Sequence, residues 1–441
     1  MKKVLVLGAG LVAGPLVRYL LDQEEFQVIV ASRTLAKARA LVGEAPNGLA
    51  REIDVNDRRA LSEEIAGSDL AVSLLPYVYH PLVAGICVER TKPMVTTSYV
   101  KQEMKDHDAT ARDAGVILLN ELGVDPGIDH MSAMQVIDRI KQKGGELVGF
   151  SSYCGGLPAP EANDNPFGYK FSWSPRGVLL AGKNPARYVE DDKVVDIPGE
   201  ELFDHHWPVE VEGLGTLEGY PNRDSLPYMQ TYSISGVRSM FRGTLRYPGW
   251  CATMRKISGL GFLSDDERDD LADLTFGELT CRLIGGCAGN PRGKLAGFLG
   301  VDENSAVISN LEWLGLLGDD PLPAGATSLL DVLTARMLEK MSYIEGERDM
   351  LVMQHQFLAR YEDRTEKTTS LLIDYGIPGG DSAMSRLVGF PAAIAAKLVL
   401  QGEIGLVGVQ VPVVPQLYDP ILAELAEMGV RFTEKTEIVA S

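Results

Sequence analysis

The chain has 441 residues, enough for two or three domains that each bury a complete hydrophobic core. Hydrophobic residues make up 45% of the sequence and charged residues 23%, which is ordinary for a globular protein. The formal net charge of −19 argues against nucleic acid or an anionic membrane as a partner, because both select for basic surfaces.

Cysteine usage indicates a reducing compartment. The five cysteines are scattered, odd in number and without a C-x-x-C pair; they are Cys87, Cys154, Cys251, Cys281 and Cys287. This pattern fits the cytoplasm and gives no reason to expect a metal site. Beyond the glycine-interrupted N-terminus, no run of about 18 or more apolar residues occurs, so no membrane span is expected.

The N-terminal segment has the pattern of a dinucleotide-binding turn. The apolar run Val4–Leu7 predicts a buried strand that leads into Gly8-x-Gly10-x-x-Ala13, then a helix and a second strand at Val28–Ala31. Gly8 permits the tight turn, Gly10 lets the backbone approach the pyrophosphate, and Ala13 lets the helix pack on the strand. The phosphates would then meet the N–H groups at the start of the helix.

The end of the second strand indicates which cofactor is bound. An NAD site usually has an acidic residue there to hold the ribose 2′-hydroxyl. This chain has Ser32, Arg33 and Thr34 instead, and a guanidinium with two hydroxyls suits a 2′-phosphate. The sequence therefore predicts NADP; the alternative is that Arg33 only caps a solvated turn.

Further apolar segments predict a parallel sheet with polar residues at the ends of its strands. The expected strands are Arg51–Val55, Leu70–Leu75, Pro93–Thr97 and Val116–Leu119. Ligands of such a sheet bind beyond the carboxyl ends of the strands. The residues expected on that rim are Asn56, Pro76, Thr97, Ser98, Tyr99 and Asp125, although each alone is also an ordinary loop residue.

Residues 153–177 have neither the period of a helix nor the alternation of a strand. Glycine and proline interrupt this segment, yet it contains five aromatic residues, Tyr153, Phe167, Tyr169, Phe171 and Trp173. Because ordinary linkers are poor in aromatic residues, we expect a functional loop that lines a substrate site. A structural loop with aromatic anchors is the alternative.

The pattern changes beyond residue 127, and several domains are expected. A Rossmann-type domain over residues 1–127 would be completed by about 388–441, and a substrate-binding α/β domain would comprise 128–263 and 342–387. Residues 264–341 would form a helical insert that begins with a capping Ser264 and an acidic, solvated helix face through Asp270. The expected later elements are strands near Val148–Tyr153, Thr231–Ile234 and Gly243–Tyr247, a hairpin of Asp349–Tyr361 and Lys367–Tyr375, and helices at Phe390–Gln401 and Pro420–Met428. The fold class is α/β, with a doubly wound parallel sheet and a second, mixed domain.

Motifs along nearly the whole chain resemble a known family, the NADP-dependent, L-glutamate-forming saccharopine dehydrogenases (saccharopine reductases). The first-domain helices and residues 185–219 depart more from the family pattern, as does most of 264–341. The motifs that carry the resemblance are GAGLVAGP, ASRT, DVND, SLLPY, VTTSYV, NELGVDPGIDH, the SYCGGLPAPEANDNPFGYKFSWSPRGVL loop, GYPNRDS, RGTLRYPG, GERDM and VGFPAAIAAKL.

The resemblance implies an oxidoreductase of lysine metabolism. Such enzymes join L-glutamate to 2-aminoadipate 6-semialdehyde as an imine and reduce it with NADPH to saccharopine. The tricarboxylate product needs local cations, and the resemblance assigns substrate contacts to Arg223 and Arg246. A planar guanidinium suits bidentate carboxylate binding. From the residues alone, each arginine is more often a structural ion-pair partner.

Other site residues follow from the same resemblance. Expected at the substrate are Ser98, Tyr99, Asp125, Trp173, Ser174, Thr244 and Leu245, and expected near the cofactor, besides Gly8 and Gly10, are Leu11, Val12, Ala13, Ser32, Arg33, Thr34, Asn56, Pro76, Thr97, Ser98, Val124, Asp125 and Pro126. Candidates for proton transfer during imine formation are Asp125, Tyr99 and Cys154, although the substrate's own amines could move the protons. His130 more often has a packing role at such a helix start.

Two alternatives stay open at this point. One is a related imine reductase of the carboxynorspermidine synthase type, and the other is a non-catalytic NADP-binding protein. We expect a cytoplasmic homodimer that binds small molecules, neither nucleic acid nor membrane. Both lysine biosynthesis and lysine breakdown use this chemistry, and the sequence does not indicate the direction.

Overall fold

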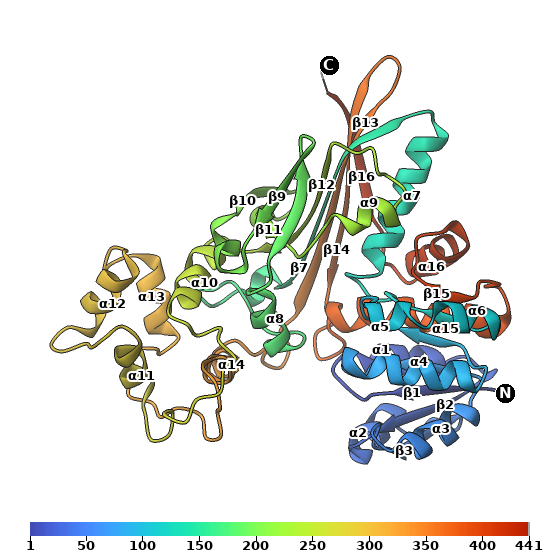
Figure 1. The fold of residues 1–441 in the computed structure, drawn as a ribbon, viewed down its shortest axis with the longest axis horizontal. Coiled ribbons are helices and arrows are strands. Elements are labelled where there is room, and N and C mark those ends of the chain that lie inside the picture. Colours follow the sequence, from blue (N-terminus) through green and yellow to red (C-terminus); the bar gives the residue numbers. More distant parts are fainter. Residues whose placement is uncertain (440–441) are drawn as a thin grey trace. The chain divides into compact units, whose positions relative to one another are not determined.

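The structure is a computed structural model that describes residues 1–439, and it divides into two compact units (Figure 1). The first comprises Met1–Gly145 and Gly380–Phe432, and the second Glu146–Gly379 and the C-terminal residues from Thr433. Two boundaries differ from the sequence-based division. The helix after residue 127 belongs to the first unit, and the C-terminal strand belongs to the second, because it pairs with the second sheet.

The first unit is built on a seven-stranded sheet whose strand pairs are all parallel, in the order β15-β6-β5-β4-β1-β2-β3. This is a doubly wound sheet, and its strand order reverses between β1 and β4, where such folds bind ligands. The strands are β1 Lys2–Leu7, β2 Phe26–Ser32, β3 Gly48–Glu52, β4 Leu70–Ser73, β5 Met94–Thr96, β6 Ile117–Leu119 and β15 Gly408–Gln410.

Helices surround this sheet and supply the apolar residues of its core (Figure 1). The helices of the first unit are α1 Ala13–Leu21, α2 Leu35–Val42, α3 Arg58–Ala66, α4 His80–Glu89, α5 Gln102–Lys105, α6 Asp108–Asp113, α7 Ile128–Gln142, α15 Ala383–Gln401 and α16 Pro415–Glu427, with a short 3₁₀ turn at Tyr77–Tyr79.

Helix α15 packs closely on α1 and begins at Ala383, earlier than the expected Phe390. A Cβ atom at Gly389 would stand 3.1 Å from the backbone nitrogen of Leu16, so glycine permits the close approach. By length and composition this helix is apolar enough to cross a membrane, but 67% of its apolar window is buried inside the protein. This burial is typical of a core helix.

The second unit is built on a nine-stranded mixed sheet in the order β10-β11-β12-β7-β13-β14-β16, with β8 and β9 paired beside β12. The expected hairpin is present as β13 and β14, and β7 lies between β12 and β13. The strands are β7 Glu146–Pro158, β8 Ala186–Glu190, β9 Lys193–Ile197, β10 Trp207–Val211, β11 Gly215–Pro221, β12 Ser239–Arg246, β13 Asp349–Arg360, β14 Thr365–Tyr375 and β16 Thr433–Val439.

The helices of the second unit lie beside the strands or, between residues 250 and 340, beyond one end of the sheet (Figure 1). They are α8 Pro175–Ala181, α9 Pro227–Thr231, α10 Trp250–Gly259, α11 Phe276–Leu283, α12 Pro291–Leu299, α13 Ala306–Trp313 and α14 Leu329–Lys340, with 3₁₀ turns at Pro160–Ala162 and Gly199–Asp204.

Two secondary-structure elements that the sequence predicts are absent from the structure at the expected positions, a helix start at Ser264 and a strand at residues 231–234. Residues 264–270 form a loop, in which the Ser264 hydroxyl donates to Asp266 rather than capping a helix. The first helix of the insert starts later, where Thr275 and Glu278 form a reciprocal capping box. Residues 231–234 are the end of α9 and a turn rather than a strand, because Pro227 at the first helical turn starts a helix there.

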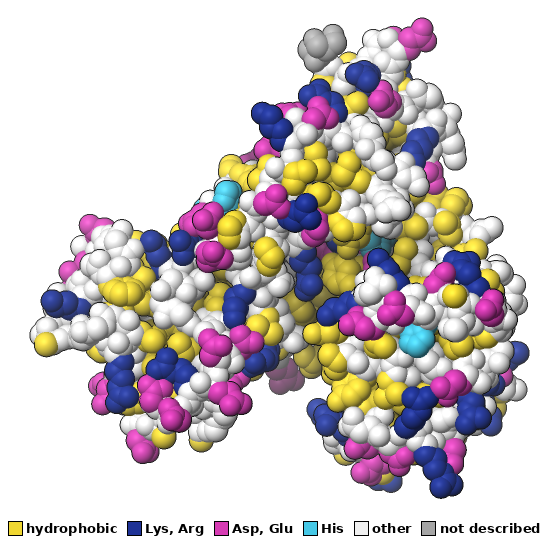
Figure 2. Space-filling view, viewed as in Figure 1, with side chains coloured by type: hydrophobic (Ala, Val, Ile, Leu, Met, Phe, Trp, Pro, Cys, Tyr) yellow, Lys and Arg dark blue, Asp and Glu magenta, His cyan; other side chains and the backbone are white. Residues whose placement is uncertain are grey.

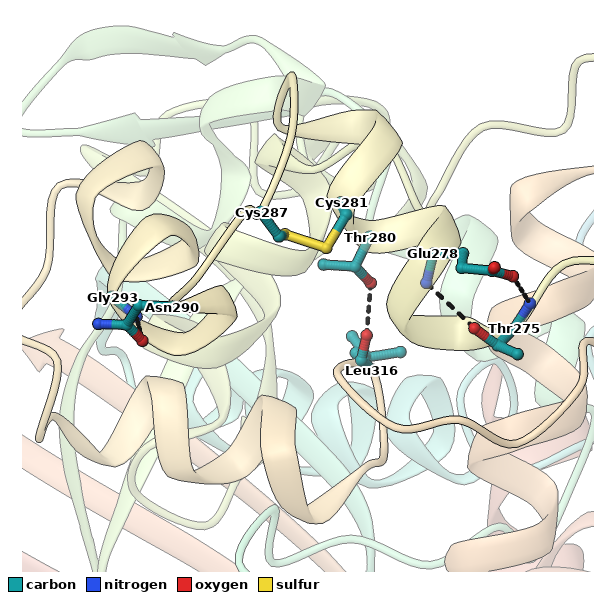
Figure 3. The surroundings of a disulfide bond; sticks show 8 residues. All are labelled: Thr275, Glu278, Thr280, Cys281, Cys287, Asn290, Gly293 and Leu316. Carbon is teal, nitrogen blue, oxygen red and sulfur yellow. Dashed lines mark hydrogen bonds between the residues drawn. A yellow bond between two sulfur atoms is a disulfide. The ribbon is translucent and has the colours of Figure 1, made fainter.

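The scattered cysteines, which fit a reducing compartment, did not lead us to expect a disulfide, but the structure has one. Cys281 and Cys287 form a disulfide that closes the glycine-rich turn after α11 (Figure 3). Gly285 and Gly286 have φ of +81° and +119° in this turn, which allows the chain to return within six residues. Beside it, the Thr280 hydroxyl donates to the carbonyl of Leu316 at 2.6 Å.

The visible surface carries lysine and arginine interspersed with aspartate and glutamate, and no broad basic patch lies on this face of either unit (Figure 2). Among residues 1–439, no group of three or more His, Cys, Asp or Glu side chains is placed to hold a metal ion.

Candidate functional site

The turn after β1 forms a cradle for a dinucleotide. Gly8 has φ of +113°, and a Cβ there would stand 3.0 Å from the carbonyl oxygen of Leu74, so only glycine fits. At Gly10 a Cβ would meet no atom within 4 Å, which leaves open space beside the backbone. Val12, the residue before α1, makes no side-chain cap, so the first N–H groups of the helix can face a phosphate. Leu11 is 74% exposed beside this turn.

The residues expected at the 2′-phosphate lie at the end of β2. Arg33 and Thr34 are exposed, and the Ser32 hydroxyl accepts a hydrogen bond from the Thr34 N–H at 3.2 Å. Asn56 lies after β3 and donates through its backbone and side chain to Asp54. These two bonds, with Arg33 nearby, lower the pKa of the Asp54 carboxyl. Arg33 is thus an exposed cation on the rim of the sheet, as a 2′-phosphate requires.

The segment after β5 carries Thr97, Ser98 and Tyr99, all half-buried. Ser98 Oγ lies 2.9 Å from His80 Nε2, and the Val100 N–H donates to Glu121 Oε1 at 2.8 Å. Tyr99 donates to Asp125 Oδ1 at 2.8 Å. Three separate hydrogen bonds therefore fix this segment.

Asp125 belongs to the turn between β6 and α7, with buried Val124 and Pro126 on either side. His130 follows in the first turn of α7, where its Nε2 lies 2.6 Å from Glu121 Oε2, and its side chain is 0% exposed. This is consistent with the packing role expected for His130. The structure therefore brings Ser98, Tyr99 and Asp125 together on the first unit, whereas Pro76 is exposed beyond β4.

In the second unit, strand register places Cys154 beside Thr244, on the neighbouring strands β7 and β12. Arg246 lies two residues further along β12 and therefore on the same face as Thr244, whereas Leu245 points to the opposite face. Leu245 contributes its carbonyl oxygen instead, which accepts a hydrogen bond from Arg246 Nη1 at 2.8 Å.

Arg246 is a buried cation in an aromatic pocket. Its side chain is 5% exposed, and its guanidinium carbon lies 4.8 Å from the ring centre of Tyr169 and 5.4 Å from that of Trp250. It forms no ion pair with any carboxylate of residues 1–439. Its Nε, the Tyr169 hydroxyl and the Trp250 Nε1 are all buried and lack a hydrogen-bond partner in the described chain. Because a buried charge is costly unless it is paired, this pocket is suited to an anionic ligand.

The carboxylate opposite Arg246 in the sheet register is engaged elsewhere. Glu218 pairs with Arg246 across β11 and β12, but its two oxygens accept hydrogen bonds from the N–H groups of Gly249 and Cys251, at 2.7 and 3.0 Å. These bonds fix the start of α10, which carries Trp250. Glu218 therefore shapes the pocket without neutralising its arginine.

The irregular part of the central loop is residues 159–174, because Tyr153 lies within β7. The loop is held by buried Phe167, Tyr169 and Phe171 and by Lys170, which pairs with Glu347 at 2.5 Å. Its aromatic residues are thus core anchors, and one of them, Tyr169, also covers Arg246.

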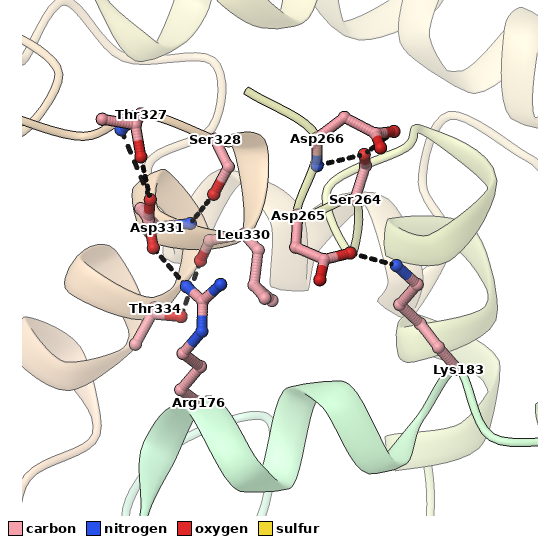
Figure 4. A network of polar contacts seen from close by, with 10 residues as sticks. All are labelled: Arg176, Lys183, Ser264, Asp265, Asp266, Thr327, Ser328, Leu330, Asp331 and Thr334. Carbon is pink, nitrogen blue, oxygen red and sulfur yellow. Dashed lines mark hydrogen bonds and ion pairs between the residues drawn. The ribbon is translucent and has the colours of Figure 1, made fainter. Parts of the chain in front are cut away.

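The loop ends at half-buried Trp173 and exposed Ser174, whose hydroxyl accepts from the Gly177 N–H and caps α8. Helix α8 is tied to the helical insert by two ion pairs (Figure 4), Arg176 with Asp331, and Lys183 with Asp265 at 2.7 Å. Thr327 and Ser328 hold Asp331 in place through further hydrogen bonds.

Arg223 lies on an exposed turn after β11 with φ of +59°, a conformation that non-glycine residues seldom adopt. Residues in such conformations cluster at functional sites, although six other non-glycine residues between 1 and 439 also have a positive φ. The structure also adds residues that the sequence did not single out, His80 in the first unit and Trp250 in the second. The only signal for Trp250 was its place directly after the RYPG motif.

Two family descriptions match the chain, the saccharopine dehydrogenase NADP binding domain over residues 4–119 and the saccharopine dehydrogenase C-terminal domain over residues 123–430. The chain belongs to the saccharopine dehydrogenase family. The match over residues 4–119 confirms the prediction of an NADP-binding domain.

Relatives of this saccharopine dehydrogenase family member match over nearly the full length. The NADP(+)-dependent, L-glutamate-forming saccharopine dehydrogenase of Schizosaccharomyces pombe is 39% identical, with 99% of each chain covered. That of Pyricularia oryzae is 41% identical over 98% of this chain and 99% of the relative. The solved structure of apo saccharopine dehydrogenase (L-Glu forming) from Saccharomyces cerevisiae matches all of both chains at 39% identity and a TM-score of 0.91. The expected fold class is thereby confirmed.

Proposed function

We propose that this protein is an NADP-dependent oxidoreductase that interconverts saccharopine with L-glutamate and 2-aminoadipate 6-semialdehyde. The observation that carries this function is Arg246, a cation that is buried between Tyr169 and Trp250 with no carboxylate of the described chain to neutralise it. A substrate with three carboxylates supplies the anion that this pocket lacks. A charge-assisted hydrogen bond in such a buried site contributes about 1.5–3 kcal/mol.

The cofactor residues divide by the part of NADP that each would hold. The turn of Gly8 and Gly10 and the start of α1 would hold the pyrophosphate, and Ser32, Arg33 and Thr34 would bind the 2′-phosphate. When bound, the reduced cofactor supplies the hydride that converts the imine carbon to an amine. The protein orients the substrate and moves protons.

Asp125 and Tyr99 are the pair that we assign to proton transfer. Their 2.8 Å hydrogen bond joins a carboxylate that can accept a proton to a phenol that donates to the carboxylate and stabilises its charge before the transfer. Forming the imine from glutamate and the semialdehyde requires a proton to be delivered to the departing hydroxyl and one to be taken from the amine nitrogen. Cys154 lies beside Thr244 in the second unit, and we assign this cysteine to the substrate-facing wall.

Absorbance at the NADPH band tests the function directly. Purified protein with saccharopine and NADP should reduce the cofactor and release glutamate, with a slower rate when NAD replaces NADP. NADPH binding without turnover of saccharopine would contradict this function, and carboxylated polyamines would be the next substrates to assay. Turnover that prefers NAD would keep the reaction and overturn the role of Arg33.

We further propose a cytoplasmic homodimer. An open hollow of about 500 Å³ lies on the second sheet, with Val148, Gly149 and Leu358 among its lining residues and Arg238, Arg360 and Asp191 beside them. An apolar centre with a charged rim is typical of subunit interfaces. Light scattering should give twice the 47.9 kDa chain mass, and Leu358→Asp should lower it; an unchanged mass for that variant would exclude this face. Cell fractionation tests the location.

A further inference from the structure

His80 is a buried histidine for which the proposed reaction has no role. It is 2% exposed at the start of α4, and three hydroxyl groups surround its ring. Nδ1 lies 2.9 Å from Ser73 Oγ, and Nε2 lies 2.9 Å from Ser98 Oγ and 3.2 Å from Thr96 Oγ1. Ser98 is the one of these three that is partly exposed.

The direction of these hydrogen bonds follows from where the protons can go. A neutral imidazole has one N–H and one bare nitrogen, and a buried hydroxyl must donate its proton to an acceptor. Ser73 is 0% exposed, and His80 Nδ1 is the acceptor within reach of its hydroxyl. If Ser73 donates to Nδ1, then Nε2 bears the ring proton and donates it to Ser98 Oγ. Thr96 is also buried, and its hydroxyl would compete for Nε2, but its contact of 3.2 Å is longer than the 2.9 Å contact of Ser73 with Nδ1. The shorter contact therefore sets the direction, because the reverse direction would leave the Ser73 proton without an acceptor.

We propose that His80 is a positioning residue that holds Ser98 as a hydrogen-bond donor toward a carboxylate of the substrate. The Nε2–H bond occupies a lone pair of Ser98 Oγ, so the hydroxyl proton of Ser98 points away from the ring. A serine held in this way favours a carboxylate oxygen over an ammonium group. This inference rests on the proposed function, in which Ser98 faces saccharopine.

Burial supports a neutral ring. It lowers the pKa of His80 to about 4, so the imidazole carries no charge at neutral pH. All three partners of the ring are hydroxyl groups, which agrees with an uncharged imidazole that has one protonated nitrogen and one bare nitrogen.

The tautomer can be measured without any activity assay. Long-range proton–nitrogen correlation spectra of ¹⁵N-histidine-labelled protein report which ring nitrogen bears hydrogen, and His80→Gln assigns the signal among the six histidines. The expected spectrum has a protonated Nε2 and a bare Nδ1. A ring protonated at Nδ1 would overturn the inference.

Kinetics then separates a positioning role from a structural one. His80→Gln keeps an amide donor near the place of Nε2, so its KM for saccharopine should stay within about threefold of the wild-type value. The shorter side chain of His80→Asn cannot reach Ser98, and this variant should raise the KM for saccharopine roughly tenfold. Tenfold corresponds to about 1.4 kcal/mol, the contribution of one hydrogen bond. The KM for NADPH should not change. Thr96→Val is the matched control, because it removes the longer hydroxyl contact and should leave the saccharopine KM unchanged.

Thermal unfolding of each variant identifies general loss of fold. His80→Asn with an unchanged saccharopine KM would overturn the inference while the proposed function stands. A wild-type protein that does not oxidise saccharopine would overturn the proposed function. The spectrum would still report which ring nitrogen of His80 bears the proton and thus whether Nε2 can donate to Ser98.

Discussion

Tyr99 donates a hydrogen bond to Asp125 Oδ1 across 2.8 Å, which ties the segment after β5 to the turn after β6. Neighbouring parallel strands end at the same edge of the sheet, so two residues far apart in the sequence meet there. The pair presents one acidic and one phenolic group at the rim where the cofactor cradle also lies.

Substitutions of Asp125 and Tyr99 distinguish the role of the Asp125 carboxylate as a base from the role of the hydrogen bond that positions it. Asp125→Asn keeps an oxygen that Tyr99 can donate to but removes the base, and kcat should fall by about a hundredfold, as is usual for loss of acid–base catalysis. Tyr99→Phe removes one hydrogen bond and should lower kcat by about tenfold or less. The kcat of each variant should be measured from pH 6 to 10. An Asp125→Asn variant with the wild-type kcat would limit Asp125 to holding Tyr99.

Arg246 should control substrate affinity without affecting the cofactor. Arg246→Met keeps much of the packing against Tyr169 and removes the charge, and the KM for saccharopine should rise by about a hundredfold, which corresponds to about 3 kcal/mol. The dissociation constant for NADPH, measured by fluorescence, should not change. Arg255→Ala is the control, because Arg255 is a partly exposed arginine paired with Asp204 in the same unit. Equal effects from both substitutions would exclude a specific role for Arg246.

Arg33 should determine the choice between NADP and NAD. Arg33→Ala should raise the KM for NADPH by about tenfold or more through the loss of charge-assisted hydrogen bonds to the 2′-phosphate. The KM for NADH should change little, because NADH lacks that phosphate. Arg39→Ala, at an exposed position on α2, is the control. A loss of affinity that is equal for both cofactors would contradict this assignment.

Burial of His80 should make stability depend on pH in the acid range. Burial lowers the pKa of His80 to about 4 in the folded state, below its ordinary value of 6.5, so the unfolded chain binds more protons between these values. The stabilisation is complete above pH 6.5 and is lost as the pH falls toward 4, by up to about 3 kcal/mol. Urea unfolding of wild type and His80→Gln across pH 4–7 measures this loss, because the free energy of unfolding should fall more steeply with decreasing pH in the wild type than in the variant. Parallel curves would show that His80 is not neutral in the fold.

The disulfide of Cys281 and Cys287 should contribute modest stability to the insert. It closes a short loop with a sequence separation of 6, for which loss of chain entropy on unfolding gives about 2 kcal/mol. A reductant should lower the unfolding midpoint of wild type but not that of Cys281→Ser. A wild-type midpoint that does not respond to reductant would mean that the two thiols are already reduced in the purified protein.

Much of the first unit was predictable, because its signals are local. The Gly8 turn, the apolar strands and the missing acid at the end of β2 lie within a few residues of each other, and the NADP-binding domain is confirmed. The hairpin of β13 and β14 was predicted from the alternation of its own residues. An alternating pattern shows which face of a strand is buried, and it can be recognised without knowing which strand pairs with it.

The errors arise where local signals compete. Ser264 and the acids after it resemble a helix start, but the chain turns there, and the capping box at Thr275 starts the helix instead. Cys281 and Cys287 are six residues apart, but no feature of the sequence around them distinguishes a disulfide from two reduced thiols. The contact between His80 and Ser98 depends on two different strands ending together, and the pocket of Arg246 requires Trp250 from a following helix.

The position of α15 has a consequence for how the protein is made. Arg18 at α1 pairs with Asp381 at the start of α15, across a sequence separation of 363 residues. The whole second sheet except β16 is synthesised between these two helices. During translation, domains begin to fold as their chain emerges. Helix α1 therefore leaves the ribosome long before its packing partner α15, and the first unit cannot complete its core until most of the second unit has been synthesised.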